Sequence, residues 1–336
     1  MRDEFLHGGA LDIMQAKYPM APTPWIDLST GINPWPYLFE DISPAMIHHL
    51  PTQATYLKCR KAMANAMGTM VENVLLSAGS EILIRLLPVI LSPKRVVVLS
   101  PSYGDHARVW RAAECEVIET TDPLSHASDA DMIVLCNPNN PDGRLFKLSA
   151  LEQVRVEMAA RGGWLVVDEA YADLDPQCSL TWQSGTQPSA AGLIILRSLG
   201  KFYGLAGLRL GAMIAPSNLR DEMSQRLGVW NISGPALEVA TQAYQDLPWQ
   251  VETRSRLADA CERLDNIFRR VGIQDITGTN LYRYIRHERA QQMWELLAHK
   301  GIYVRRFSDR PLHLRFGLPP DAASEARLYK ALSSCQ

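Results

Sequence analysis

The amino-acid sequence predicts an α/β protein with a mostly parallel sheet sandwiched by helices. Short apolar runs, such as RVVVL at 95–99, DMIVL at 131–135 and WLVV at 164–167, alternate with polar stretches of helical length. Continuous apolar strands between helices are typical of parallel sheets, because both faces of such a sheet are buried. Right-handed crossovers then bring the strand ends to one edge of the sheet, where ligands bind.

The pattern along the 336 residues indicates three parts. Residues 1–35 are rich in proline, glycine and tryptophan and show little periodicity, so we expect an extended arm packed against another part. Residues 36–235 carry the alternating pattern of the large domain. Residues 236–336 combine helical stretches with short strands and predict a smaller α+β domain.

Each element of the two domains has its own signal in the sequence. In the large domain, glycine punctuation predicts where helices end and where strands turn. The expected elements there are a helix at 56–68, a strand, a turn at Gly79 and a helix within 73–91, a helix at 148–163, and two strands within 192–215. The smaller domain is expected to hold helices at 236–247 and 252–272 and strands within 279–287, 301–307 and 312–318.

Composition and charge narrow the classes of function. The 47% hydrophobic and 21% charged content is that of a soluble globular protein, and a net charge of -2 gives no reason to expect nucleic acid. No apolar run approaches the roughly 18 residues of a membrane span, and the N-terminus lacks the apolar region of a signal peptide. The six cysteines are scattered without a C-x-x-C pair, so we expect reduced thiols in a cytoplasmic protein and no metal site.

Polar residues gather at the predicted strand ends. Each of them alone has a plain explanation as a helix cap, a turn or a solvated side chain. Together they form a set at one sheet edge. The set is Gly79, Ser80, Glu81, Tyr103, Asn140, Asp168, Tyr171, Ser198, Lys201 and Arg209.

This set of residue types suits pyridoxal phosphate. The cofactor needs a lysine amine for a Schiff base and an anion beside its pyridine nitrogen, and Lys201 and Asp168 supply them. Asn140 and Tyr171 are candidate ligands of its phenolic oxygen, and Tyr103 offers a stacking face.

The cofactor phosphate needs backbone amides at a helix N-terminus, together with hydroxyl and guanidinium donors. Gly79, Ser80 and Glu81 open a predicted helix, and Ser198 and Arg209 flank the lysine. We therefore expect the same cofactor to be held at both of its ends.

Four segments resemble, in order and spacing, the motifs of the class I/II aminotransferase superfamily of fold-type I pyridoxal-phosphate enzymes. They are NPNNPDG, VVDEAY, SLGKFYGLAGLRLG and LHLRFG. The resemblance implies the cofactor roles above for the residues within these motifs. It also implies that Arg315 binds the substrate α-carboxylate, that Tyr56 reaches the cofactor phosphate of the neighbouring subunit, and that the protein is a homodimer.

A narrower resemblance lies in the N-terminal arm. HGG at 7–9 and WIDLSTGINPWPY at 25–37 are similar to segments of threonine-phosphate decarboxylases of cobalamin biosynthesis, which convert O-phospho-L-threonine to (R)-1-amino-2-propanol phosphate. This implies substrate contacts from His7, Gly8 and Asn140, and from Arg305 to the phosphate or the carboxylate. Longer relatives have asparagine at the position of Gly31, so that contact is either missing here or made by the backbone.

Three alternatives remain to be weighed. A histidinol-phosphate-type aminotransferase would use a similar site with 2-oxoglutarate as amino acceptor, and the HGG arm argues against it. A non-enzymatic regulator is disfavoured because the sequence shows no helix-turn-helix pattern and no basic patch. A nucleotide-binding protein is disfavoured because GLAGLRLG lacks the G-x-G-x-x-G spacing. Strand alternation further predicts that only one of Arg305 and Arg306 faces the site.

Overall fold

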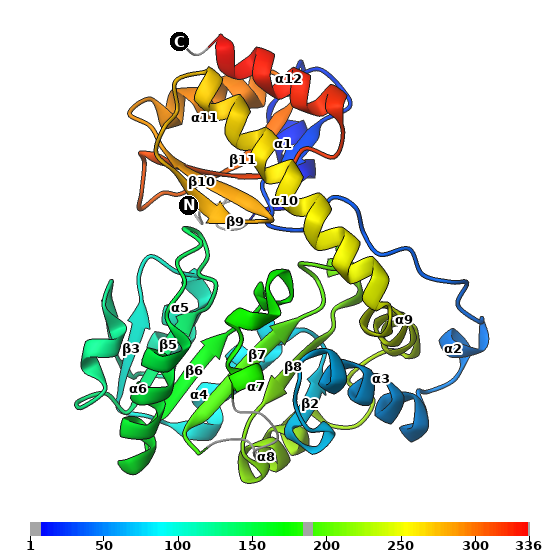
Figure 1. Ribbon diagram of the computed structural model, residues 1–336, viewed down its shortest axis with the longest axis vertical. Helices are drawn as coiled ribbons and strands as arrows, with labels where there is room; N and C mark the ends of the chain where they lie inside the picture. Colours follow the sequence, from blue (N-terminus) through cyan, green and yellow to red (C-terminus); the bar gives the residue numbers. More distant parts are fainter. Residues whose placement is uncertain (1–7, 184–190, 335–336) are drawn as a thin grey trace. The chain divides into compact units, whose positions relative to one another are not determined.

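The computed structural model describes residues 8–183 and 191–334 as two compact units (Figure 1). Within these residues, the larger unit holds Tyr37–Asn140, residues 144–183 and residues 191–250. The smaller unit holds residues 8–36, Pro141–Gly143 and residues 251–334. The arm thus belongs to the same unit as the C-terminal part of the chain.

A seven-stranded sheet forms the centre of the larger unit. Its strand order is β2-β8-β7-β6-β5-β3-β4, and the pairs from β4 to β7 are parallel while β8 runs antiparallel to both its neighbours. The predicted mostly parallel sheet is therefore confirmed. The strands are β2 (Val74–Ser77), β3 (Arg95–Leu99), β4 (Glu116–Thr120), β5 (Met132–Cys136), β6 (Trp164–Asp168), β7 (Leu193–Ser198) and β8 (Gly211–Ile214).

Helices bury both faces of this sheet, because successive residues of its central strands are all buried. Leu87, Trp110 and Met223 bring three helices, α4, α5 and α8, into one core cluster with Val96 and Val98. Val97 lies between Val96 and Val98 in β3, so its side chain points to the opposite face of the sheet. It is also fully buried. The helices of this unit include α2 (Ala45–His48), α3 (Gln53–Ala66), α4 (Ser80–Leu91), α5 (Gly104–Ala112), α6 (Leu148–Ala160), α7 (Leu180–Gln183), α8 (Ser217–Leu227) and α9 (Gly234–Gln245).

The smaller unit contains a five-stranded sheet in the order β1-β11-β12-β10-β9. Its first strand comes from the arm and pairs in parallel with β11. The arm also contains a helix, so it is not extended throughout as expected. The elements are α1 (Leu11–Lys17), β1 (Ile26–Leu28), β9 (Ile276–Thr279), β10 (Tyr282–Arg286), α11 (Ala290–His299), β11 (Ile302–Arg306), β12 (His313–Gly317) and α12 (Ala322–Ser333).

One long helix, α10 (Leu247–Arg270), begins in the larger unit, and its residues from Val251 onward belong to the smaller one. The predicted change of pattern at residue 236 falls within α9, which packs against α3 in the larger unit. None of the helices within residues 8–183 and 191–334 has the length and apolarity needed to cross a membrane.

Candidate active site

Asp168 is the last residue of β6, and its carboxylate is held by a buried histidine. Oδ2 of Asp168 lies 3.0 Å from Nε2 of His106, and Oδ1 accepts the backbone N–H of Ala170 at 3.1 Å. Burial opposes the charged form of His106, but the nearby Cys136 sulfur and the Asp168 carboxylate outweigh it and raise its pKa to about 10. His106 is therefore an imidazolium at neutral pH, and its contact fixes the position of the buried Asp168 carboxylate at the end of β6.

His106 and Cys136 were not singled out from the sequence. His106 follows Tyr103 by three residues on the first turn of α5, and this spacing was the available signal. One ligand atom each of His106, Cys136 and Asp168 lies within 4.8 Å of the others, so this buried group could hold a metal ion, although the sequence predicted none. The hydrogen bond between His106 and Asp168 also orients the carboxylate at the end of β6.

Lys201 lies in the loop between β7 and β8. Its Nζ is 6.0 Å from the centroid of the Tyr171 ring, and Tyr171 is itself 4% exposed. Strands β5, β6 and β7 are neighbours, and Asp168 stands in register with Leu196 near the end of β7. Asn140, which follows β5, therefore comes to the same edge of the sheet as Asp168 and the lysine loop. The prediction that these strand ends share an edge is confirmed.

The N-terminus of α4 forms a cradle with the far end of the lysine loop. Gly79 precedes the helix with φ +84°, and a Cβ there would lie 3.1 Å from Nη2 of Arg209. A Cβ at Gly211 would lie 2.5 Å from the backbone nitrogen of Ser80. The positive φ at Gly79 and the close backbone approach at Gly211 each favour glycine. The unpaired N–H groups of the first helical turn and the Arg209 guanidinium are thereby brought together, which makes an anion site.

Tyr103 and Glu81 contact each other at this edge. The Tyr103 hydroxyl donates to Oε2 of Glu81 at 3.2 Å, and Oε1 of Glu81 pairs with Nη2 of Arg85 at 2.7 Å. Burial and the neighbouring carboxylates raise the pKa of Tyr103. The Glu81 side chain is thus engaged within the protein, and its possible role toward a phosphate is left to its backbone N–H.

Ser198, the last residue of β7, accepts the backbone N–H of Gly200 at 3.4 Å. Its hydroxyl hydrogen is then available to an anion beside the loop. These features fit pyridoxal phosphate: a lysine amine, a buried carboxylate with a protonated partner, and an anion cradle lie at one sheet edge of a single unit.

A buried cluster of ion pairs joins the residues next to Asp168 and Ser198 at this edge of the sheet. Arg197 is 1% exposed, and its Nη1 lies 3.0 Å from Oε2 of Glu169, while its Nη2 pairs with Asp173. Burial raises the pKa of Glu169, and the charge of Arg197 opposes that rise. Glu169 follows Asp168, and Arg197 precedes Ser198. The cluster therefore ties the loop after β6 to the end of β7.

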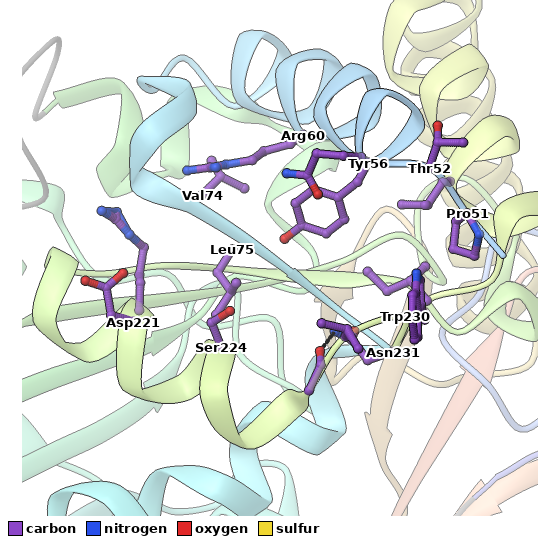
Figure 2. Close-up of a pocket in the computed structure, with 16 residues that line it drawn as sticks. Pro51, Thr52, Tyr56, Arg60, Val74, Leu75, Asp221, Ser224, Trp230 and Asn231 are labelled. Carbon is purple, nitrogen blue, oxygen red and sulfur yellow. Dashed lines mark hydrogen bonds between the residues drawn. The ribbon is translucent and has the colours of Figure 1, made fainter.

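Tyr56 lies on α3, where its hydroxyl accepts the backbone N–H of Leu76 at 3.2 Å (Figure 2). It lines a cavity of about 550 Å³ within the larger unit. Burial raises the pKa of Tyr56, so the hydroxyl keeps its proton at neutral pH. Its role toward the cofactor phosphate of a neighbouring subunit stays a prediction.

In the smaller unit, Arg315 on β12 is 7% exposed and donates to the carbonyl oxygen of Ser29 at 3.0 Å. Ser29 also contacts the beginning of the arm, because Gly9 donates its N–H to Oγ of Ser29 at 2.8 Å. A Cβ at Gly8 would lie 2.3 Å from the Ser29 carbonyl oxygen, so the residue there must be glycine. The structure thus brings Gly8 and Arg315 together around Ser29, which the sequence analysis did not name.

Arg305 stands directly opposite Arg315 in the antiparallel pairing of β11 with β12. Like charges opposite each other destabilise a sheet, and an anionic ligand bound by both guanidinium groups would offset this repulsion. The Arg306 guanidinium instead lies 4.1 Å from the centroid of the Trp294 ring, in packing. Gly31 is buried, and His7 lies outside the described residues.

Comparison with known proteins decides the family. Residues 42–321 match the family model described as aminotransferase class I and II. The chain belongs to this family. The lysine loop, Asp168 and the α4 cradle are therefore parts of an aminotransferase fold, as the resemblance implied.

Two curated relatives of this family match nearly the whole chain. A threonine-phosphate decarboxylase of Pseudomonas aeruginosa is 38% identical over 334 residues, which cover 97% of this chain and 96% of the relative. A threonine-phosphate decarboxylase of Sinorhizobium sp is 36% identical, and the match covers 99% of each chain. The solved histidinol-phosphate aminotransferase from Sinorhizobium meliloti, in complex with pyridoxal-5'-phosphate, superposes with a TM-score of 0.79 at 16% identity. That match covers 96% of this chain and 93% of the other and shows the shared fold.

Proposed function

We propose that this aminotransferase-family chain is a pyridoxal-phosphate-dependent carboxy-lyase. It converts O-phospho-L-threonine to (R)-1-amino-2-propanol phosphate and carbon dioxide for cobalamin biosynthesis. The observation that carries the proposal is the full-length match to two threonine-phosphate decarboxylases, combined with a site whose residues fit the cofactor. We further propose that it acts as a cytoplasmic homodimer, with Tyr56 reaching the cofactor phosphate of a second copy.

The cofactor, when bound, supplies an electron sink for the pair left on the substrate α-carbon as carbon dioxide departs. Asp168, positioned by the His106 imidazolium, would accept the hydrogen bond of a protonated pyridine nitrogen. The first turn of α4, with Arg209 against Gly79, holds the phosphate, and Ser198 adds a hydroxyl. These contacts fix the ring so that it does not turn away from the reacting bond.

Lys201 has two tasks in this reaction. Its amine holds the cofactor before the substrate arrives, and its Nζ then delivers a proton to the α-carbon after carbon dioxide has left. Tyr171, whose ring lies beside that Nζ, limits where the lysine amine can move. A proton placed on this carbon leaves the amino group on the product, and the Lys201 amine would then displace that product, so no amino acceptor is needed.

The substrate carries two anionic groups, and the smaller unit offers two opposed guanidinium groups. Arg315 is assigned to the α-carboxylate and Arg305 to the phosphate, with the Gly8 backbone beside Ser29 as a further contact. Anchoring the phosphate far from the reacting carbon spends binding energy on orienting the bond to the carboxylate. This orientation separates decarboxylation from loss of the α-proton, which a transaminase requires.

The test is to incubate the holoenzyme with O-phospho-L-threonine without any keto acid. We expect carbon dioxide in molar excess over the enzyme, with the absorption of the bound cofactor regained at the end. Absence of carbon dioxide, together with turnover that depends on 2-oxoglutarate, would contradict the proposal and favour an aminotransferase.

Two neighbouring arginines give a matched pair for the substrate contact. Arg305→Met is expected to raise KM for O-phospho-L-threonine roughly 100-fold, since a charged hydrogen bond worth about 2–3 kcal/mol is lost. Arg306→Met, whose guanidinium packs on Trp294, is expected to leave KM unchanged. Equal KM values in the two variants would remove Arg305 from the phosphate contact.

A further inference from the structure

One face of the five-stranded sheet carries a row of three side chains from neighbouring strands. Arg315 on β12 stands directly opposite Tyr284 on β10 and opposite Arg305 on β11. Residues directly opposite each other in antiparallel strands point to the same face of the sheet, so the three side chains share one face. Arg306, the next residue of β11, points to the other face, where its guanidinium packs on Trp294 of α11. The two arginines assigned to the substrate therefore lie on the face opposite to the one that α11 covers.

An aromatic side chain, Phe307, follows this row directly after β11. Cζ of Arg305, the centre of its guanidinium, lies 5.3 Å from the centroid of the Phe307 ring. Cζ of Arg310 lies 5.0 Å from the same centroid. A guanidinium at such a distance is attracted by the negative charge on the face of an aromatic ring. Phe307 is therefore a platform for two cations, of which Arg305 is the proposed ligand of the substrate phosphate.

Neighbouring rings hold Phe307 in place. Tyr284 contacts it in a T-shaped arrangement, with the ring centroids 5.6 Å apart and an angle of 84° between the planes. Tyr284 also stacks on His313, at a centroid distance of 4.9 Å and an angle of 7°. Burial raises the pKa of Tyr284 to about 12, so it is an uncharged ring at neutral pH. A member of the row thus fixes the Phe307 ring, and that ring contacts the guanidinium of another member.

The two cations on the Phe307 ring lie in different surroundings. Nη2 of Arg310 pairs with the carboxylate of Asp309 at 3.1 Å, so a neighbouring anion already offsets its charge. Arg305 has a like charge, Arg315, directly opposite it, and this repulsion favours other positions of its long side chain. The contact with Phe307 counteracts the repulsion and limits the rotamers that Arg305 adopts. A side chain that is ordered before the ligand arrives loses less conformational entropy on binding.

We propose that Phe307 is a positioning residue for the contact of Arg305 with the substrate phosphate. Its ring holds the Arg305 guanidinium on the substrate-binding face of the sheet before the substrate arrives. The ring itself donates nothing to the phosphate and acts only through Arg305. This role rests on the proposed function, because the phosphate contact of Arg305 belongs to it.

Steady-state kinetics of the holoenzyme with O-phospho-L-threonine tests this role through Phe307→Leu. Phe307 is only partly buried and leucine keeps an apolar side chain there, so we expect the variant to fold. KM should rise roughly tenfold while kcat changes less than about twofold, since the ring acts on binding and not on the reacting bond. Phe307→Tyr keeps the ring face and should keep KM near the wild-type value. An unchanged KM in Phe307→Leu would overturn the proposal.

The smaller unit offers a matched control for the loss of an aromatic ring beside an arginine. Tyr329 on α12 is partly buried, and the centroid of its ring lies 4.1 Å from Cζ of Arg270 on α10. Neither residue belongs to the proposed site. Tyr329→Leu should therefore leave KM and kcat at their wild-type values, and a tenfold rise in its KM would show that such a rise in Phe307→Leu is not specific to Arg305.

The double variant Phe307→Leu/Arg305→Met shows whether the ring acts through Arg305. Arg305→Met alone is expected to raise KM roughly 100-fold. Once the guanidinium is gone, loss of its platform adds nothing, so the double variant should have the same KM as Arg305→Met. A KM roughly tenfold higher in the double variant than in Arg305→Met would overturn the proposal, because the ring would then act independently of Arg305.

A measurement without turnover separates failure of this proposal from failure of the proposed function. The rate of phenylglyoxal modification of Arg305 is followed by peptide mass spectrometry on the full-length holoenzyme. Arg305 should react several-fold faster in Phe307→Leu than in the wild type or in Phe307→Tyr, because it has lost its contact with the ring. Arg111, which is exposed and pairs with Glu119 in the larger unit, should react at the same rate in all three proteins.

The modification rates have two clear outcomes. Equal rates at Arg305 in the three proteins would overturn the positioning role, whether or not the wild type releases carbon dioxide. Faster modification in Phe307→Leu, together with no carbon dioxide release by the wild type, would support the hold of Phe307 on Arg305 and contradict the carboxy-lyase activity alone.

Discussion

The larger unit holds two groups of arginines that differ in what neutralises them. Arg197 on β7 is fully buried and contacts the carboxylates of Glu169 and Asp173. Arg60 and Arg220 face a cavity, and neither forms an ion pair with a described carboxylate. The charge of the first group is neutralised within the fold, whereas no described carboxylate pairs with the second group.

The difference teaches how to separate charges that hold the fold from charges that no described carboxylate neutralises. A buried ion cluster resists the loss of any one member, because the remaining charges are left without compensation. A pair of like charges in a cavity is instead relieved when one of them is removed. Asp168 lies between these cases, since it contacts His106 within the fold and is also the proposed partner of the cofactor.

The largest expected effect is on the Arg197 cluster. Arg197→Met leaves Glu169 and Asp173 buried without a cation, and the loss should be about 3–5 kcal/mol of unfolding free energy. Urea unfolding of the holoenzyme, followed by circular dichroism, measures it, with the exposed Arg111→Met as the control. A loss below about 1 kcal/mol would erase the contrast between the two groups.

The neighbouring carboxylates Asp168 and Glu169 allow a cofactor-binding role to be compared with a structural one. Asp168→Asn should lower the rate of carbon dioxide release on the order of 100-fold or more, because an amide does not hold the pyridine proton. Glu169→Gln should mainly lower stability, since its oxygens contact Arg197, Ser179 and the Leu180 N–H rather than a ligand. Initial rates and urea midpoints of both variants separate the roles. A rate loss in Glu169→Gln as large as that in Asp168→Asn would contradict this division.

His106 should make the stability of the protein depend on pH. Its pKa in the folded protein, about 10, lies above the ordinary value of 6.5, so the charged form is favoured by folding. The stability it contributes is therefore fully present below pH 6.5 and is lost as the pH rises through about 10. Urea midpoints of the apoprotein between these limits should fall more steeply in the wild type than in His106→Asn. Parallel pH profiles would show that the imidazolium is not held by Asp168.

Much of the cofactor edge could be predicted because each motif has a fixed offset from a strand. Asp168, Asn140 and Ser198 directly follow or end apolar strands, and the order of those strands in the sheet was not needed to place them at one edge. Gly79 likewise predicted where α4 begins. The structure of the arm was harder to predict. Its strand β1 has only three residues and is stabilised by pairing with β11, which is distant in the sequence.

The pairings between distant residues could not be predicted. His106 and Asp168 are 62 residues apart, and Arg197 and Glu169 are 28 apart. Whether such side chains meet depends on which strands are neighbours and on which face each residue lies, and a single sequence specifies neither. The cavity of Arg60 and Arg220 is the same case, because it joins α3 to α8.

The smallest expected effect is on the cavity pair. Arg60→Met removes one of two like charges and no ion pair, so the unfolding free energy of the protein should change by no more than about 0.5 kcal/mol. Relief of the repulsion on Arg220 offsets the lost packing of the Arg60 side chain. The measurement is urea unfolding of the apoprotein in phosphate-free buffer, with Arg197→Met measured under the same conditions. A loss near that of Arg197→Met in the absence of phosphate would place Arg60 among the charges that hold the fold.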